Sequence, residues 1–303
     1  MGLNDPVTDK ALIAMVPARL AVSTRFRSLP VAVDDPPHHH VREQAIAWQT
    51  VSGYATFWEM MASRASDDVA YALAGQMGAA GEQLALAYAA AVEVALWREV
   101  DAEGDEAVGQ EMCMRAMSES QSLFVMGAAH ALANLAVRAL SLSADLRAKL
   151  ARELRHRHPA DAFDPFSLSP SDWRSMNATL CAGLDAAVKG SHLAIQNLIA
   201  PIVRFGQGTS WGALKDQRDK DFHRWRPQTY GLQGVPQRSQ WQDTGASRVL
   251  AVGHPVDPEA EGIGETIARL ATSAMLELAS IMEEFMDAWH AASPVLGGPS
   301  YPS

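Results

Sequence analysis

The chain has 303 residues, of which 48% are hydrophobic and 20% are charged, and this balance excludes an intrinsically disordered protein. Its net charge of −10 speaks against a protein that coats nucleic acid without specificity. Alanine is abundant and β-branched residues are sparse, which favours helices over strands.

The cysteines and the apolar segments bear on the cellular compartment. Cys113 and Cys181 lie in apolar, helical contexts without the CxxC spacing of a zinc site, which indicates free thiols in a reducing compartment. The apolar run at 11–16 is short and lacks a basic leader, so it does not resemble a secretory signal. No uninterrupted apolar run reaches the length of a membrane span. We therefore expect a cytoplasmic protein.

The first 40 residues predict an irregular N-terminal arm, because prolines recur at positions 6, 17, 30, 36 and 37. The arm ends in three adjacent histidines, His38, His39 and His40. Consecutive ligands rarely converge on one metal ion without a second motif, so a solvated loop is the favoured interpretation.

Residues 41–303 predict a single helical domain. Hydrophobic periodicity and helix-breaking residues indicate helices at 41–62, 66–77, 82–102, 106–142, 143–157, 170–200, 209–226 and 265–290. Four of them are long: 82–102, 106–142, 170–200 and 265–290. The expected fold is an all-α bundle of about six to eight helices, with a long loop at 227–262 before the C-terminal helix.

The helix at 209–226 carries the most informative stretch, Arg-Asp-Lys-Asp-Phe-His at 218–223. Thr209 or Ser210 can cap its start, and Pro227 prevents it from continuing much further. Arg218 lies on the same stripe as the apolar side chains Trp211, Leu214, Phe222 and Trp225. A guanidinium on an apolar stripe needs an acceptor or a ligand, because burying an unpaired charge is costly.

This hexapeptide resembles the R-x4-6-H signature of the HEPN superfamily, in which a polar residue typically follows the arginine. HEPN domains are small helical bundles, and many are metal-independent ribonucleases of toxin, antiviral and RNA-processing systems that pair two motifs across a dimer. The resemblance implies that Arg218 and His223 form a catalytic pair and that Asp219 supports it. It also implies a homodimer, an RNA substrate, an antitoxin or regulatory protein as partner, and no metal or other cofactor. It covers six residues in a helical context.

The charge distribution is compatible with an anionic ligand near this motif. Residues 201–250 hold eight lysines and arginines against four aspartates, a local charge of +4 in an acidic chain. Arg224, Trp225, Arg226 and Tyr230 mix cations with aromatic rings, a combination that suits single-stranded RNA. The alternative is the packed end of a surface helix.

A polar ridge of His130, Asn134 and Arg138 runs along an otherwise apolar helix. Such a ridge must be satisfied inside the fold or line a pocket. It predicts either an interhelical hydrogen-bond network or a second wall of the Arg218/His223 cleft that binds substrate.

Two functions of different classes follow. The first is a metal-independent HEPN-type endoribonuclease, in which His223 acts as acid or base and Arg218 stabilises developing charge. The second is a non-catalytic helical module for protein interaction or small-ligand binding, in which Arg218 forms a structural ion pair with Glu59, Glu93 or Glu283.

Overall fold

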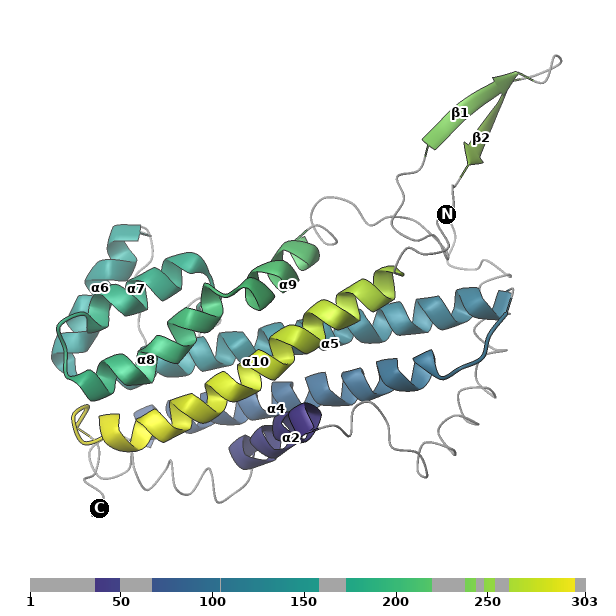
Figure 1. Ribbon diagram of the computed structural model, residues 1–303. Helices are drawn as coiled ribbons and strands as arrows, with labels where there is room; N and C mark the ends of the chain where they lie inside the picture. The colour runs from purple at the N-terminus through teal and green to yellow at the C-terminus, as the bar shows by residue number, and fades with distance from the viewer. Residues whose placement is uncertain are drawn as a thin grey trace.

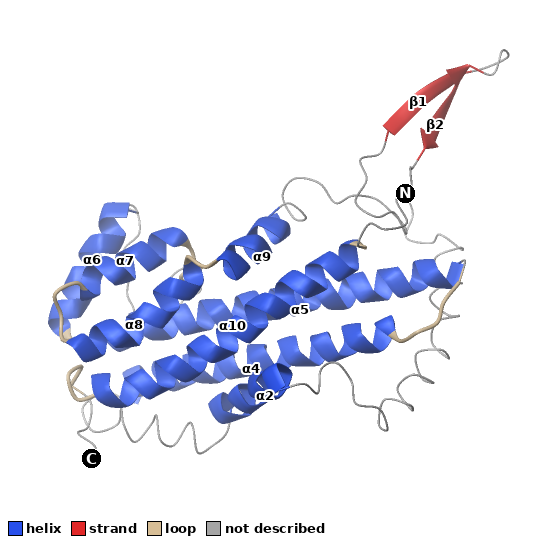
Figure 2. Cartoon of the chain, in the orientation of Figure 1, coloured by secondary structure: helices blue, strands red, loops and turns tan. Residues whose placement is uncertain are grey.

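The computed structural model describes residues 36–49, 67–103, 105–157, 173–219, 238–243, 248–253 and 262–297. Within these residues it contains eight helices and one pair of short strands (Figures 1 and 2). The helices are α2 (Pro36–Gln49), α4 (Asp67–Arg98), α5 (Asp105–Leu140), α6 (Ala144–Arg157), α7 (Ala178–Val188), α8 (Leu193–Gly206), α9 (Thr209–Asp219) and α10 (Ile263–Ala292). The predicted all-α, multi-helix bundle is confirmed.

The three longest helices, α4, α5 and α10, lie side by side and form the body of the bundle (Figure 1). The apolar stripe predicted for the C-terminal helix is buried on α10, where Leu278, Phe285 and Trp289 are fully inaccessible to solvent. Each side chain of this size contributes about 1.5–3 kcal/mol when it is completely buried. The stripe therefore explains why α10 packs against α5, α8 and α2 at once.

Small residues allow the helices to approach closely. A Cβ atom added at Gly81 of α4 would come within 2.8 Å of Trp48 Cβ and 3.1 Å of the Gln49 backbone nitrogen on α2. At Gly127 of α5, it would lie 2.6 Å from Oε1 of Gln83 on α4. The helices α4 and α5 therefore approach each other closely at Gly127, and α2 and α4 do so at Gly81.

Two of the predicted long helices have different limits. Helix α4 is continuous from Asp67 to Arg98, whereas the sequence predicted a break between 77 and 82. The predicted helix at 170–200 is instead divided between α7 and α8 by a turn in which Gly190 adopts a φ of +75°. The second helix also continues beyond Pro201 to Gly206. The predicted start of this helix, at 170, lies outside the described residues.

Two segments predicted to be irregular are regular. Helix α2 begins at Pro36, so His38, His39 and His40 belong to a helix rather than to a solvated loop. Within the predicted 227–262 loop, β1 (Arg238–Asp243) and β2 (Arg248–Gly253) pair antiparallel, with Arg238 opposite Gly253 and Asp243 opposite Arg248. The two strands form a sheet of their own.

Two helical stretches, Ala72–Arg98 and Gly109–Leu140, are long and apolar enough to cross a membrane by length and composition. The lack of an uninterrupted apolar run in the sequence therefore does not exclude helices of spanning length. Both stretches are packed in the bundle, and the second is mostly buried there, as the core helix of a soluble protein also is.

Candidate functional site

Helix α9 places Arg218 at the edge of the bundle. Trp211 and Leu214 of α9 are buried, as the predicted stripe requires, and they fix the helix against α8 and α10. Arg218 follows one turn after Leu214, where its side chain is 36% exposed while its Nε is buried. The guanidinium is therefore buried at Nε, while the rest of the side chain is partly exposed to solvent.

Asp219 lies between two cations. Its Oδ2 accepts a hydrogen bond from Lys215 Nζ at 2.7 Å, and its Oδ1 lies 3.7 Å from Arg218 Nη1. The three side chains are each more than a third exposed, so water screens these interactions, and they carry a net charge of +1. Basic side chains in the last turn also interact favourably with the helix dipole. The position of Asp219 beside Arg218 is compatible with the supporting role that the motif implies.

His130 of α5 lies close to Arg218. Its ring meets that of Trp211 edge-on, with centroids 5.8 Å apart, and its Nδ1 accepts a hydrogen bond from the Met176 backbone N–H at 2.9 Å. Burial and, to a lesser extent, the Arg218 cation lower the pKa of His130 from 6.5 to about 4. His130 is therefore neutral at neutral pH, with its proton on Nε2.

Asn134 forms hydrogen bonds with the backbone of the segment that leads into α7. Its two Nδ2 hydrogens go to the carbonyl oxygens of His130 and Arg174, both at 2.7 Å, and its Oδ1 accepts from the Arg174 N–H at 3.0 Å. Both N–H groups of the amide are thereby used inside the fold. For Asn134, the hydrogen-bond network is the interpretation that the contacts favour.

Arg138 is only 4% exposed and lies two turns beyond His130, or about 12 Å along α5 at the rise of an α-helix. Asn134 and Arg138 are thus buried, His130 is half-buried, and the His130 ring contacts Trp211 of α9. The structure brings together Arg218, Asp219, Trp211 and His130.

The remaining predicted site residues are His223, Arg224, Trp225, Arg226 and Tyr230, and the predicted stripe also includes Phe222. All of them lie outside the described residues. Of the acidic partners considered for Arg218, Glu283 lies instead 3.6 Å from His40, and Glu59 is outside the described residues.

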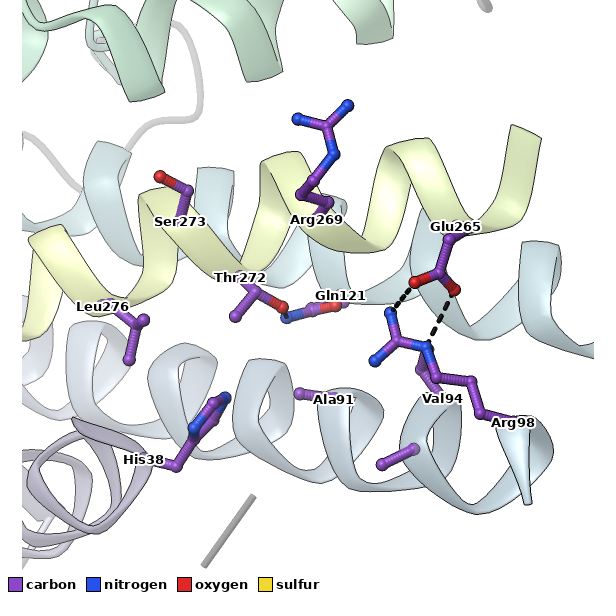
Figure 3. A pocket seen from close by; sticks show the side chains of 11 residues that line it. His38, Ala91, Val94, Arg98, Gln121, Glu265, Arg269, Thr272, Ser273 and Leu276 are labelled. Carbon is purple, nitrogen blue, oxygen red and sulfur yellow. Dashed lines mark hydrogen bonds and ion pairs between the residues drawn. The ribbon is translucent and has the colours of Figure 1, made fainter. Parts of the chain in front are cut away.

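A cavity of about 400 Å³ lies among α2, α4, α5 and α10 (Figure 3). Its walls include the small or apolar side chains Ala91, Val94 and Leu276, and its polar lining includes Gln121 and Thr272. Arg98 and Glu265 form a bidentate ion pair at its edge, with distances of 2.8 Å from Nε and 2.6 Å from Nη2.

The sequence did not single out this cavity. The contact between Gln121 and Thr272 joins residues 151 positions apart, and the contact between Arg98 and Glu265 joins residues 167 positions apart. The sequence signal that could have pointed to it is Gln121, a glutamine flanked by serines in an apolar helix. A polar side chain in such a helix needs hydrogen-bond partners inside the fold.

Comparisons with protein-family models, with curated proteins and with solved structures found no match to this chain.

Proposed function

We propose that the chain is a metal-independent endoribonuclease of the HEPN type, acting in the cytoplasm in a toxin or defence setting. Arg218 and His223 are its catalytic pair, and Asp219 positions Arg218. Arg224, Trp225, Arg226 and Tyr230 bind the RNA strand through phosphate contacts and base stacking.

The observation that carries this proposal is the setting of Arg218. Its buried Nε and the packed stripe of Trp211 and Leu214 limit the motion of the side chain, while its outer end is open to solvent. A cation held in this way is preorganised to stabilise negative charge that develops on a phosphate. Its carboxylate neighbour Asp219 is also bound by Lys215, so the cluster retains a positive charge.

The proposed reaction is a transesterification. A base takes the proton of the ribose 2′-OH, O2′ forms a bond to phosphorus, and the bond from phosphorus to O5′ breaks as an acid protonates O5′. The products are a 2′,3′-cyclic phosphate and a 5′-hydroxyl, and no water is activated. Arg218 stabilises the charge on the non-bridging oxygens, and His223 acts as base or acid.

His130 does not fill the second acid–base role. Its pKa of about 4 keeps it neutral, its Nδ1 is occupied by the Met176 N–H, and its Nε2–H is a weak acid. A second His223, from another copy of the chain, supplies the missing group. The proposal therefore includes a homodimer, and an antitoxin or regulatory protein as the partner that restrains it.

The test is incubation of the pure full-length protein with total RNA, with and without EDTA. Wild type should cleave the RNA in both conditions and leave 2′,3′-cyclic phosphate ends. His223→Ala should lose cleavage without a loss of stability, and His290→Ala, which removes an exposed histidine of α10, should cleave as wild type does. Equal RNA integrity with wild type and with His223→Ala would overturn the proposal.

The second candidate is a non-catalytic module that binds a protein or a small ligand. It is favoured by one observation, the use of His130 and Asn134 in hydrogen bonds that hold the fold together. Under this alternative, Arg218→Ala lowers the stability of the fold and no variant changes the integrity of RNA.

A further inference from the structure

Helix α6 is cationic in an acidic chain. Residues 144–157 hold five lysines and arginines against two acidic residues, a net charge of +3, whereas the whole chain has a net charge of −10. Leu146, Leu150 and Leu154 are buried against the bundle. Leu154 also packs against Gly183 of α7, where an added Cβ would lie 3.1 Å from Leu154 Cδ2. The helix is therefore fixed by its apolar side, and its polar side faces solvent.

Three cations of α6 have described side chains, and together they form the α6 surface: Arg147, Lys149 and Arg152. Arg147 is exposed, Lys149 is half-buried, and the Arg152 side chain is 73% exposed. By the 3.6-residue period, Arg147 and Lys149 flank Arg152 around the helix axis. The positive charge therefore covers the solvent-facing half of the helix.

The fold leaves these cations largely without partners. Glu153 lies 4.0 Å from Arg152 Nε, and no ion pair within the described ranges involves Arg147 or Lys149. On other helices, five cations meet a carboxylate at N–O distances of 2.5–3.7 Å: Arg98, Arg115, Arg204, Lys215 and Arg218. The helix dipole does not account for the α6 surface either, because it stabilises cations in the last turn, which Arg147 and Lys149 precede. The charge of the α6 surface is thus accessible to an anionic ligand.

We propose that the α6 surface binds single-stranded RNA through its phosphates, as a second contact apart from the Arg218 cluster. RNA as the partner rests on the proposed function, which supplies this substrate. Helices α6 and α9 lie apart along the bundle (Figure 1), so one RNA strand can contact both only by running along the protein. Phosphate contacts of this kind add affinity and fix the strand without reading its sequence.

An anionic membrane carries similar charge but fits the α6 surface less well. Helices that lie in a membrane interface insert large apolar side chains between the lipids. The three leucines of α6 are already buried in the bundle, and Ala148 is small. RNA, which needs only cations that its phosphates can reach, matches what the helix exposes.

The test uses a fluorescent single-stranded 2′-O-methyl oligonucleotide, which lacks the 2′-OH that the proposed cleavage requires and so reports binding alone. Fluorescence anisotropy with the full-length protein at a series of salt concentrations gives the affinity and its salt dependence. Replacing Arg147, Lys149 and Arg152 together by Gln should weaken binding at low salt by roughly tenfold or more. The slope of log K against log salt should fall in magnitude by about 2, since each phosphate contact on a single strand contributes about 0.7.

The matched control replaces Arg42, Arg98 and Arg204 together by Gln, which removes the same charge from exposed positions on α2, α4 and α8. This variant should keep the salt slope of wild type, and circular dichroism checks that both variants are folded. No binding by wild type, an equal salt slope in the α6 variant, or an equal loss in the control would overturn the proposal. Binding confined to vesicles of phosphatidylcholine and phosphatidylserine would do so as well.

Cleavage of total RNA, measured separately, distinguishes this proposal from the ribonuclease itself. If wild type cleaves RNA and the α6 variant binds the oligonucleotide as wild type does, the α6 surface is excluded and the ribonuclease stands. If the α6 variant loses binding and wild type leaves RNA intact, the ribonuclease is excluded and the α6 surface stands.

Discussion

Asn134 of α5 clamps the backbone of Arg174 through a reciprocal pair of hydrogen bonds, at 2.7 Å to its carbonyl oxygen and 3.0 Å from its N–H. Together with the bond from Met176 N–H to His130, it fixes the segment that leads into α7. The polar ridge of α5 thus performs a structural task at two of its three members.

Asn134→Leu should lower the free energy of unfolding by about 2 kcal/mol, because it leaves part-buried backbone groups of Arg174 without these hydrogen-bond partners. Denaturant unfolding followed by circular dichroism measures the change. Asn197 on α8 is exposed and serves as the matched control, so Asn197→Leu should change stability by less than about 0.5 kcal/mol. Equal effects of the two substitutions would contradict the role of the clamp.

The presence of a helix could be predicted from the sequence where a single amphipathic stripe determines it. The stripe of α10 predicted 265–290, and the helix runs from Ile263 to Ala292. The break between α7 and α8 was also encoded, since Gly190 has positive φ and His192 caps α8 through its Nδ1, but the apolar pattern on both sides concealed it. In α4 the sequence predicted an interruption between 77 and 82, which packing against α2 overrides.

The site was predictable only in part. The motif predicted Arg218 and Asp219 as site residues, and the nearness of His130 to Arg218 depends on the contact of His130 on α5 with Trp211 on α9, which no local pattern encodes. The cavity at Gln121 is assembled from four helices, and the contact between Gln121 and Thr272 joins residues 151 positions apart. Such long-range contacts depend on tertiary packing rather than on residue spacing.

Gly81→Ala should destabilise the protein by about 1–3 kcal/mol, because its Cβ would lie 2.8 Å from Trp48 Cβ and close to the α2 backbone. Gly75→Ala on the same helix is the matched control: no atom lies within 4 Å of its added Cβ. That substitution should stabilise α4 by up to about 1 kcal/mol. Thermal unfolding of the two variants should therefore shift in opposite directions, and a shared direction would contradict the close contact of α2 with α4.

His130 should make stability depend on pH. Its pKa is about 4 in the folded chain against 6.5 for the free side chain, so the unfolded state binds a proton more readily. The resulting stability is fully present above pH 6.5 and is lost as the pH falls from there toward 4, by about 3 kcal/mol in all. His130→Gln, which keeps an acceptor for Met176 N–H, should flatten this part of the profile, whereas His290→Gln should leave it unchanged. Denaturant unfolding at a series of pH values measures both profiles.

Arg218→Gln should raise the pKa of His130, because the Arg218 cation is the second cause of its depression. The pKa should stay below 6.5, since burial is the larger cause. The measurement is an NMR titration of the His130 ring proton in both proteins. An unchanged pKa would mean that the guanidinium does not lie near the imidazole, and it would remove the arrangement on which the candidate site rests.

The purified protein should be a homodimer whose two Arg218/His223 pairs meet near the axis. The reasoning is chemical: cleavage needs an acid, a base and a group that stabilises charge, and one pair supplies too few groups for all three. His130 does not supply the missing one, because its pKa of about 4 and its bond to Met176 keep it neutral and occupied. Light scattering at micromolar concentration should give twice the monomer mass, and dilution should reduce the cleavage rate per chain as the dimer dissociates. A strict monomer that cleaves RNA with a rate per chain independent of concentration would exclude the shared site while leaving catalysis by a single Arg218/His223 pair.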